Sequence, residues 1–235
     1  MAIQGKKLRN HHFLENIYAR RSRDTLQQWL ITPENNGQQV GKSFYPQDLK
    51  ALTSGIQPSL NPVIKSLLND IRCLTAADPL AEVMSEENFH LTFLAITSAR
   101  YPHARDMPPG ANLIAIFNQT VENRELAVAD LQLVALPDQL LLAGIPGEQA
   151  EKNRKMFWDA LRASEWQTPL RQRYPGQDAP PEFWHTTLLR YKAEKLPPGV
   201  RDYFISHSNC RYGAVSGEIR LALATYNWGE VEFLL

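Results

Sequence analysis

Two apolar segments of this chain carry the same polar pattern, although 95 positions separate them. Phe89-His90-Leu91-Thr92-Phe93 and Trp184-His185-Thr186-Thr187-Leu188 each place His-x-Thr among apolar residues. Side chains alternate between the two faces of a β-strand, so a histidine and the threonine two positions later share one face. The pattern therefore predicts two strands, in equivalent halves of the fold, that each carry an imidazole and a hydroxyl in mid-strand.

The rest of the sequence alternates between helical and strand patterns. Asn61 and Pro62 are typical of a helix start, and the apolar positions after them recur with helical spacing. Pro137-Asp138 separates two apolar runs, which predicts a β-hairpin. Further helices are predicted around 113–121, 148–164 and 200–207, and strands over 80–84, 89–97, 131–136, 139–145, 183–191, 218–226 and 231–235. This order predicts a mixed α+β fold.

We expect residues 1–43 to form a basic helical extension and residues 44–235 to form the main domain. Apolar residues recur at near-helical spacing in the extension, and a polar, turn-rich stretch at 32–41 ends it. Six basic residues oppose two acidic ones in the first 24 positions: Lys6, Lys7, Arg9, Arg20, Arg21 and Arg23. A solvated helix face explains this cluster most simply, and contact with RNA or another polyanion is the functional alternative.

Composition narrows the classes of function. Lys+Arg and Asp+Glu number 25 each, so the zero net charge disfavours a protein that coats nucleic acid, and we expect no DNA partner. No apolar run approaches the roughly 18–20 residues of a membrane span, and no signal peptide is evident at the start. Cys73 and Cys210 are isolated, and no zinc-ligand spacing occurs. We therefore expect a cytoplasmic monomer without metal or cofactor.

The two motifs supply groups suited to chemistry at phosphorus. Imidazole has an unperturbed pKa near 6.5, so two histidines across a cleft can act as base and acid at neutral pH. Threonine hydroxyls can donate hydrogen bonds to the non-bridging oxygens of a phosphate, and such a design does not require a metal. A single His-x-Thr would most simply be a hydrogen-bonded core histidine. Its occurrence twice, in similar settings, favours function.

The paired motifs His90-x-Thr92 and His185-x-Thr187 resemble those of the two-histidine (2H) phosphoesterase superfamily, which includes 2′–5′ RNA ligase-like proteins and cyclic nucleotide phosphodiesterases. The resemblance spans roughly residues 45–235. It implies a bilobed α+β fold with both motifs lining a central cleft. It also implies metal-independent hydrolysis or transfer at a cyclic or 2′–5′ phosphodiester of a small nucleotide or RNA end. The N-terminal extension lies outside the common core, and the loops at 100–110 and 174–181 match no characterised branch.

Candidate site residues follow from the motifs and from strand alternation. His90 and His185 are the candidate acid and base, in an order that the sequence leaves open, and Thr92 and Thr187 are the candidate phosphate-binding residues. Two residues after the second motif have predicted orientations, and two aromatic residues further along the chain are candidates for binding a base. Alternation places Tyr191 on the cleft face and Arg190 away from it, and Tyr226 is a candidate for stacking on a base, as is Trp228.

Two other functions fit the same residues. The cleft of a non-catalytic module could bind RNA or a phosphorylated ligand, an alternative that the basic N-terminal segment suggests. A metabolic phosphodiesterase could act on a non-nucleotide cyclic phosphate. Both alternatives use the same cleft, so they predict the same four motif residues at its walls.

Overall fold

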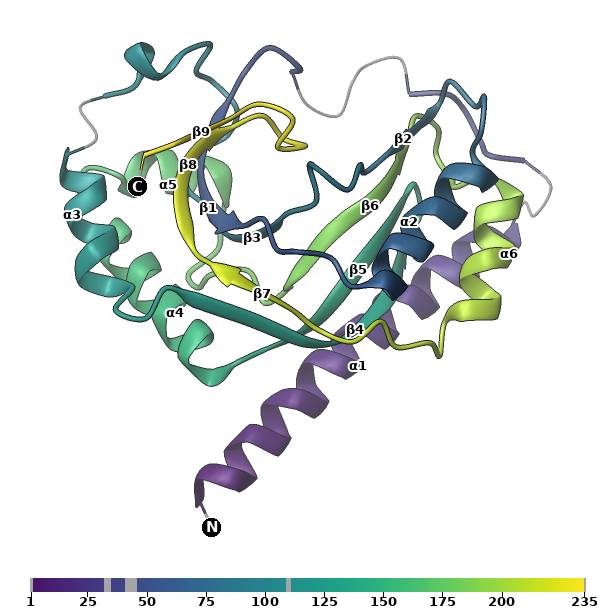
Figure 1. The fold of residues 1–235 in the computed structure, drawn as a ribbon, viewed down its shortest axis with the longest axis horizontal. Coiled ribbons are helices and arrows are strands. Elements are labelled where there is room, and N and C mark those ends of the chain that lie inside the picture. The colour runs from purple at the N-terminus through teal and green to yellow at the C-terminus, as the bar shows by residue number, and fades with distance from the viewer. Residues whose placement is uncertain (1, 32–34, 41–45, 109–110, 235) are drawn as a thin grey trace.

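A computed structural model describes residues 2–31, 35–40, 46–108 and 111–234 of the 235. Two antiparallel sheets with flanking helices form an α+β fold, as the sequence predicted (Figure 1). The helices, in chain order, are α1 (Ala2–Ile31), α2 (Pro62–Leu74), the 3-10 helix η1 (Ala104–Asp106), α3 (Ala111–Thr120), α4 (Glu148–Arg162), α5 (Gln167–Arg173) and α6 (Pro198–His207). The strands are β1 (Ala51–Ile56), β2 (Ala81–Val83), β3 (Leu91–Ala95), β4 (Glu125–Leu136), β5 (Gln139–Pro146), β6 (His185–Tyr191), β7 (Val215–Glu218), β8 (Arg220–Ala224) and β9 (Val231–Phe233).

Each sheet contains one of the two motif strands. The four-stranded sheet has the order β3-β1-β8-β9, and the five-stranded sheet has the order β2-β6-β5-β4-β7. The first motif leads into β3 and the second opens β6, so the two motifs belong to different sheets. Only Ile219 separates β7 from β8, and the chain passes from one sheet to the other at this residue.

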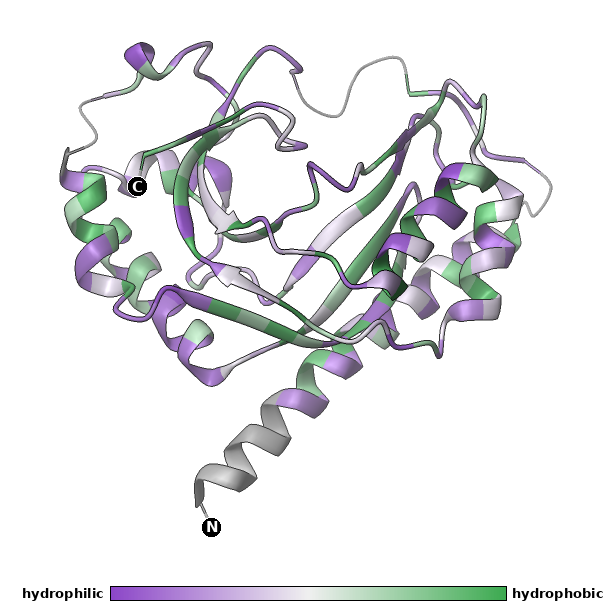
Figure 2. Ribbon diagram, viewed as in Figure 1, coloured by the Kyte–Doolittle hydropathy of each residue, from purple (hydrophilic) through white to green (hydrophobic). Residues whose placement is uncertain are grey.

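Most predicted elements are present near their expected positions. Asn61 caps α2 as predicted, because its side-chain oxygen accepts a hydrogen bond from the backbone N–H of Ile64 at 2.9 Å. The predicted hairpin is the β4–β5 pair, although β4 begins six residues earlier than expected. Apolar residues gather on the central strands, as Figure 2 shows for β4 and β5. These strands supply much of the shared core.

Four elements were not predicted: β1, the 3-10 helix η1, α5 and a separate β7. Five of the six residues of β1 are buried, so both faces of this strand are covered, and its sequence ALTSGI does not alternate between apolar and polar residues. The period-2 alternation that reveals a half-exposed strand is therefore absent. Helix α5 has seven residues and contains Pro169, so it carries no apolar stripe long enough to indicate a helix.

Helix α1 packs against the outer face of the five-stranded sheet. The Tyr18 hydroxyl donates a hydrogen bond to the Gly144 carbonyl at 2.8 Å, and the Thr25 hydroxyl donates one to the Ala135 carbonyl at 2.9 Å. Trp29 is 4% exposed, and its indole N–H donates to the Pro137 carbonyl. The predicted domain boundary at residue 43 lies outside the described residues.

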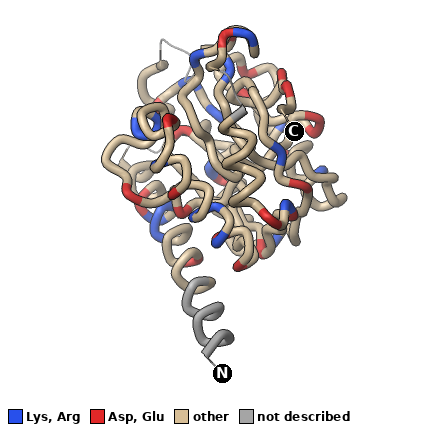
Figure 3. The backbone as a smooth tube through the Cα atoms, turned by 90° about the vertical axis from the view of Figure 1, so that its left-hand side faces the viewer, with Lys and Arg blue, Asp and Glu red and all other residues tan. Residues whose placement is uncertain are grey.

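Acidic and basic residues are interspersed along the coloured part of the backbone in the view of Figure 3. Within the described ranges, no helix combines the length and the apolar content that crossing a lipid bilayer requires.

Candidate active site

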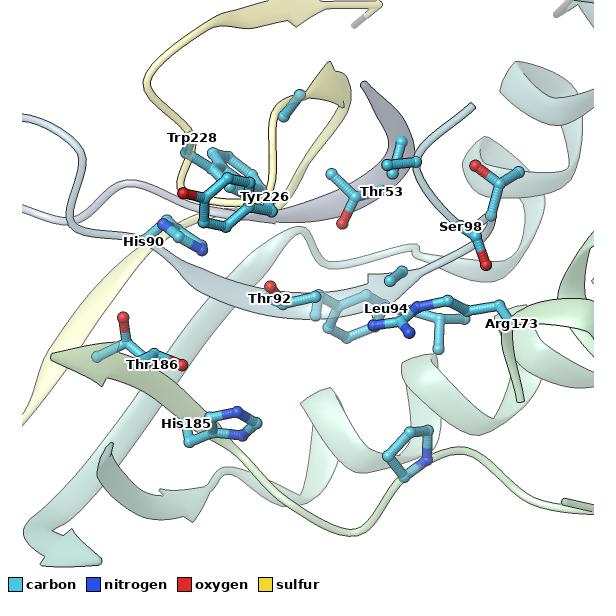
Figure 4. A pocket seen from close by; sticks show the side chains of 18 of the residues that line it. Thr53, His90, Thr92, Leu94, Ser98, Arg173, His185, Thr186, Tyr226 and Trp228 are labelled. Carbon is cyan, nitrogen blue, oxygen red and sulfur yellow. The ribbon is translucent and has the colours of Figure 1, made fainter. Parts of the chain in front are cut away.

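One cavity of about 600 Å³ brings the two motifs together. His90 and Thr92 line it from the four-stranded sheet, and His185 and Thr187 line it from the five-stranded sheet (Figure 4). The sequence predicted both motif histidines in mid-strand, and this prediction is wrong. His90 directly precedes β3, and His185 is the first residue of β6, so both imidazoles lie at strand starts.

Each motif strand contains one extra residue directly after its threonine. The pairing register jumps across Phe93 on β3 and across Leu188 on β6. A bulge of this kind leaves one residue unpaired, bends the strand and reverses the alternation beyond it. The two halves therefore share the His-x-Thr pattern and also the backbone irregularity that follows it.

The bulge at Leu188 corrects two expectations about β6. Tyr191 is not among the residues that line the cavity: its hydroxyl donates to Asp78 Oδ2 at 2.9 Å and accepts a hydrogen bond from Asn36 Nδ2 at 3.1 Å. Arg190, which was expected to point away, lines the cavity instead. The expectation failed because strict alternation assumes a regular strand, and nothing in the sequence around Leu188 indicates an extra residue.

Arg190 is a functional candidate that the sequence did not reveal. Arg190 is 9% exposed. Its guanidinium carbon lies 5.1 Å from the ring centroid of Tyr226, which also lines the cavity. One guanidinium nitrogen is 3.9 Å from a carboxylate oxygen of Glu82. The aromatic ring and the carboxylate together hold the charged group at the cavity wall.

His90 is fixed in orientation from two sides. Its Nδ1 lies 2.8 Å from the Asn88 carbonyl oxygen, which can only accept, so Nδ1 carries the proton in the neutral ring and Nε2 has the lone pair. The imidazole stacks on Trp228 with ring centroids 4.9 Å apart and planes 9° apart. Trp228 has a backbone φ of +55°, a conformation that side chains other than glycine rarely adopt. The hairpin between β8 and β9 thus holds a strained tryptophan against the first motif histidine.

His185 offers a buried nitrogen without a protein partner. Its ring makes an edge-on contact with Phe183 at 5.6 Å between centroids. Among the described residues, no group forms a hydrogen bond with its buried Nδ1 or with the buried hydroxyl of the adjacent Thr186. Buried polar atoms normally have a partner, so both atoms are candidates for contact with a ligand or a solvent molecule.

Both motif histidines are neutral at pH 7 in the free protein. Burial, together with the nearby Arg190 and His185, lowers the pKa of His90 from 6.5 to about 3, although the hydrogen bond to the Asn88 carbonyl acts in the opposite direction. Burial lowers the pKa of His185 to about 4, with Arg190 and Arg154 acting in the same direction. An anion bound between the rings would favour the charged form of imidazole and would raise both pKa values again.

The buried, neutral state of His90 predicts a specific dependence of stability on pH. Folding lowers the pKa of His90, so between pH 6.5 and pH 3 the unfolded chain binds a proton at this residue and the folded chain does not. The contribution of the neutral ring to the free energy of unfolding is therefore complete above pH 6.5 and is lost towards pH 3. We expect protonation of His90 in the unfolded chain to lower the free energy of unfolding of the wild type by up to about 1.4 kcal/mol per pH unit in this window. Urea unfolding at pH 7, 6 and 5 should show a steeper loss for the wild type than for His90→Gln. Parallel losses in the two proteins would contradict the burial of a neutral ring.

The cavity wall combines arginines with aromatic rings. Arg154, Arg173 and Arg190 line it, and no Asp, Glu or Lys among the described residues does so. Tyr226 and Trp228, the two predicted stacking residues, also line it. In the described part of the chain, no three His, Cys, Asp or Glu side chains form a group that could hold a metal ion. The cavity is thus suited to an anion that carries an apolar or aromatic part.

Neither a family model nor a curated protein matches this sequence. Among solved structures, the chain is similar to TT0787 of Thermus thermophilus, with 14% identity over 79% of this chain and 95% of that chain and a TM-score of 0.48. It is also similar to a protein described as a phosphoesterase, with 15% identity over 79% and 94% of the two chains and a TM-score of 0.45. E. coli LigT in complex with 3′-AMP gives 18% identity, the same coverage and a TM-score of 0.45.

The likeness is one of general fold. The chemistry of the cavity follows from its own side chains.

Proposed function

We propose that this chain is a metal-independent phosphodiesterase that hydrolyses, or transfers at, a cyclic or 2′–5′ phosphodiester of a small nucleotide or RNA end. One observation carries the proposal: two imidazoles from different sheets, His90 and His185, line one cavity together with Thr92 and Thr187. The arginine-lined wall supports an anionic substrate, and the aromatic residues support a nucleoside part.

The tautomer of His90 suggests how the two histidines divide the work. Because Nδ1 of His90 donates to Asn88, its Nε2 can accept a proton from the attacking water or hydroxyl. The attacking oxygen forms a new bond to phosphorus, and the bond from phosphorus to the leaving ribose oxygen breaks. His185 then donates a proton to that leaving oxygen. The threonine hydroxyls and Arg190 hold the non-bridging oxygens, where negative charge is concentrated in the transition state.

The neutral state of His185 in the free protein has a consequence for this scheme. A histidine with a pKa of about 4 carries no proton to donate at pH 7. The negative charge of the bound substrate raises that pKa, so the acid becomes protonated as the substrate binds. Substrate binding and proton uptake are therefore coupled.

Turnover of nucleoside 2′,3′-cyclic phosphates in the presence of EDTA tests the proposal. Phosphorus NMR should show conversion to a monophosphate at the same rate with and without the chelator. The panel should also contain a 2′–5′-linked dinucleotide and a non-nucleotide cyclic phosphate, because the motifs do not select among them. Binding of these compounds without any turnover would contradict the proposal and favour a non-catalytic binding module.

A further inference from the structure

The cavity contains more positive charge than a single phosphodiester requires. Three arginines line it, and no acidic residue in the described part of the chain does so, although the whole chain has a formal charge of zero. A phosphodiester carries one negative charge, which Arg190 and the two threonine hydroxyls already match. Arg154 lies near the Glu151 carboxylate, which raises its pKa, so Arg173 is the arginine that calls for a second negative group.

The three arginines lie at different positions along the cavity. Arg190 and Arg154 both lower the pKa of His185, and Arg190 also lowers that of His90. Figure 4 shows the Arg173 side chain entering the cavity from the side opposite His90, with its guanidinium group reaching towards the middle of the view. Positive charge thus extends from the motifs towards the C-terminal end of α5.

Arg173 is held at the cavity wall and is available to a ligand. Arg173 is the last residue of α5 and is half-buried. Its guanidinium carbon lies 5.4 Å from the ring centroid of Tyr174. That ring packs on Trp158, with centroids 5.4 Å apart. Among the described residues, Arg173 forms no ion pair. A positioned guanidinium without a carboxylate partner, inside a cavity, is suited to a phosphate.

Arg154 adds fixed charge to the same side of the cavity. It is 5% exposed, its guanidinium carbon lies 3.4 Å from the ring centroid of Trp184, and Nη1 donates to the Phe183 carbonyl at 3.3 Å. Arg154 lines the same cavity as Tyr174, which raises the pKa of Arg154 and whose ring also lies near Arg173. A second anion at Tyr174 would therefore be attracted by two guanidinium groups.

We propose that Arg173, supported by Arg154 and Tyr174, forms a second anion subsite, and that the substrate carries another phosphate besides the one that reacts. This inference rests on the proposed function for the assignment of the reacting phosphate to the motifs. The substrate class is then a nucleotide with its cyclic phosphate at one end and a phosphate on its 5′ side. A cavity of about 600 Å³ is within the range of sites for ligands of this size.

The test compares adenosine 2′,3′-cyclic phosphate with its 5′-phosphorylated form. In the wild type, the 5′-phosphate should raise kcat/KM by about tenfold to a hundredfold, as expected for charge-assisted hydrogen bonds. In Arg173→Gln this ratio should fall close to one, because the variant lacks the guanidinium group that distinguishes the phosphorylated compound from the unphosphorylated one. Arg171→Gln is the matched control, because Arg171 is exposed on the same helix and does not line the cavity.

Two results would overturn the subsite: no effect of the 5′-phosphate on the wild type, or an unchanged ratio in Arg173→Gln. A dinucleotide with the same cyclic end and no terminal phosphate identifies the source of the second charge. If it shows the same dependence on Arg173, the subsite accepts an internal phosphodiester of an RNA end. If it behaves like the unphosphorylated mononucleotide, the subsite requires a terminal phosphate.

A binding experiment separates failure of the subsite from failure of the proposed function. If none of these compounds is turned over, calorimetry can compare adenosine 3′-phosphate with adenosine 3′,5′-bisphosphate at one salt concentration. Tighter binding of the bisphosphate to the wild type, and equal binding of the two compounds to Arg173→Gln, would support the subsite without any catalysis. Equal binding of the two compounds to the wild type would contradict it.

Discussion

Glutamine in place of either His90 or His185 is expected to lower kcat/KM for a cyclic phosphate substrate by about 10²–10⁴-fold, the usual effect of losing a general acid or base. Glutamine keeps a polar side chain of similar length but cannot exchange a proton near neutral pH. The wild-type rate should be bell-shaped in pH, because one imidazole must be neutral and the other charged. His90→Gln should remove the acidic limb of this profile, and His185→Gln should remove the alkaline limb.

His12→Gln is the control for these variants, because this histidine has a side chain that is 72% exposed and does not line the cavity. Circular dichroism and urea unfolding at pH 7 should show that all three variants are folded. Wild-type rates in both His90→Gln and His185→Gln would remove the basis for acid–base catalysis by the pair. An exchange of the two limbs between the variants would reverse the assignment of base and acid while retaining the pair.

Arg190→Gln is expected to lower kcat by about 10²–10³-fold, as removal of one preorganised donor to transition-state charge does in other enzymes. The loss should appear mainly in kcat, because the charge on the non-bridging oxygens changes most during the reaction. Arg190→Lys keeps the charge but not the two-pronged geometry of the guanidinium, so it should recover only part of the activity. Steady-state kinetics of the two variants, at several substrate concentrations, separates kcat from KM.

Glu82→Gln separates this role from a purely structural one. This substitution removes the carboxylate that lies 3.9 Å from the Arg190 guanidinium but leaves the arginine in the cavity wall. The rate should therefore stay within a few-fold of the wild type. If Arg190→Gln is as active as Glu82→Gln, the arginine supports the fold and does not act on the substrate.

The sequence predicted the elements that are set by local patterns. The Asn61 cap, the hairpin turn at Pro137-Asp138 and the apolar stripes of the main helices depend on neighbouring residues, so a single sequence reveals them. The position of His90 and His185 in one cavity was expected from the family resemblance that the paired motifs carry, which implies a shared central cleft.

The parts of the site that the sequence did not reveal depend on non-local structure. The bulge at Leu188 is a property of the pairing between β5 and β6, and it places Arg190 in the cavity and Tyr191 outside it. Arg173 lies on a helix too short to give a periodic signal. The low pKa of each histidine follows from burial by distant segments, such as the hairpin that carries Trp228.

The passage of the chain between the sheets at Ile219 bears on when the cavity can form. Strand β1, near residue 50, has β8 as one neighbour, and β8 begins at Arg220, so the sheet beside His90 closes only through a contact between distant parts of the chain. Such pairings form slowly, because a long loop must close before the contact stabilises it. During synthesis on the ribosome, the sheet beside His90 can therefore gain this strand only after the residues of β8 have emerged.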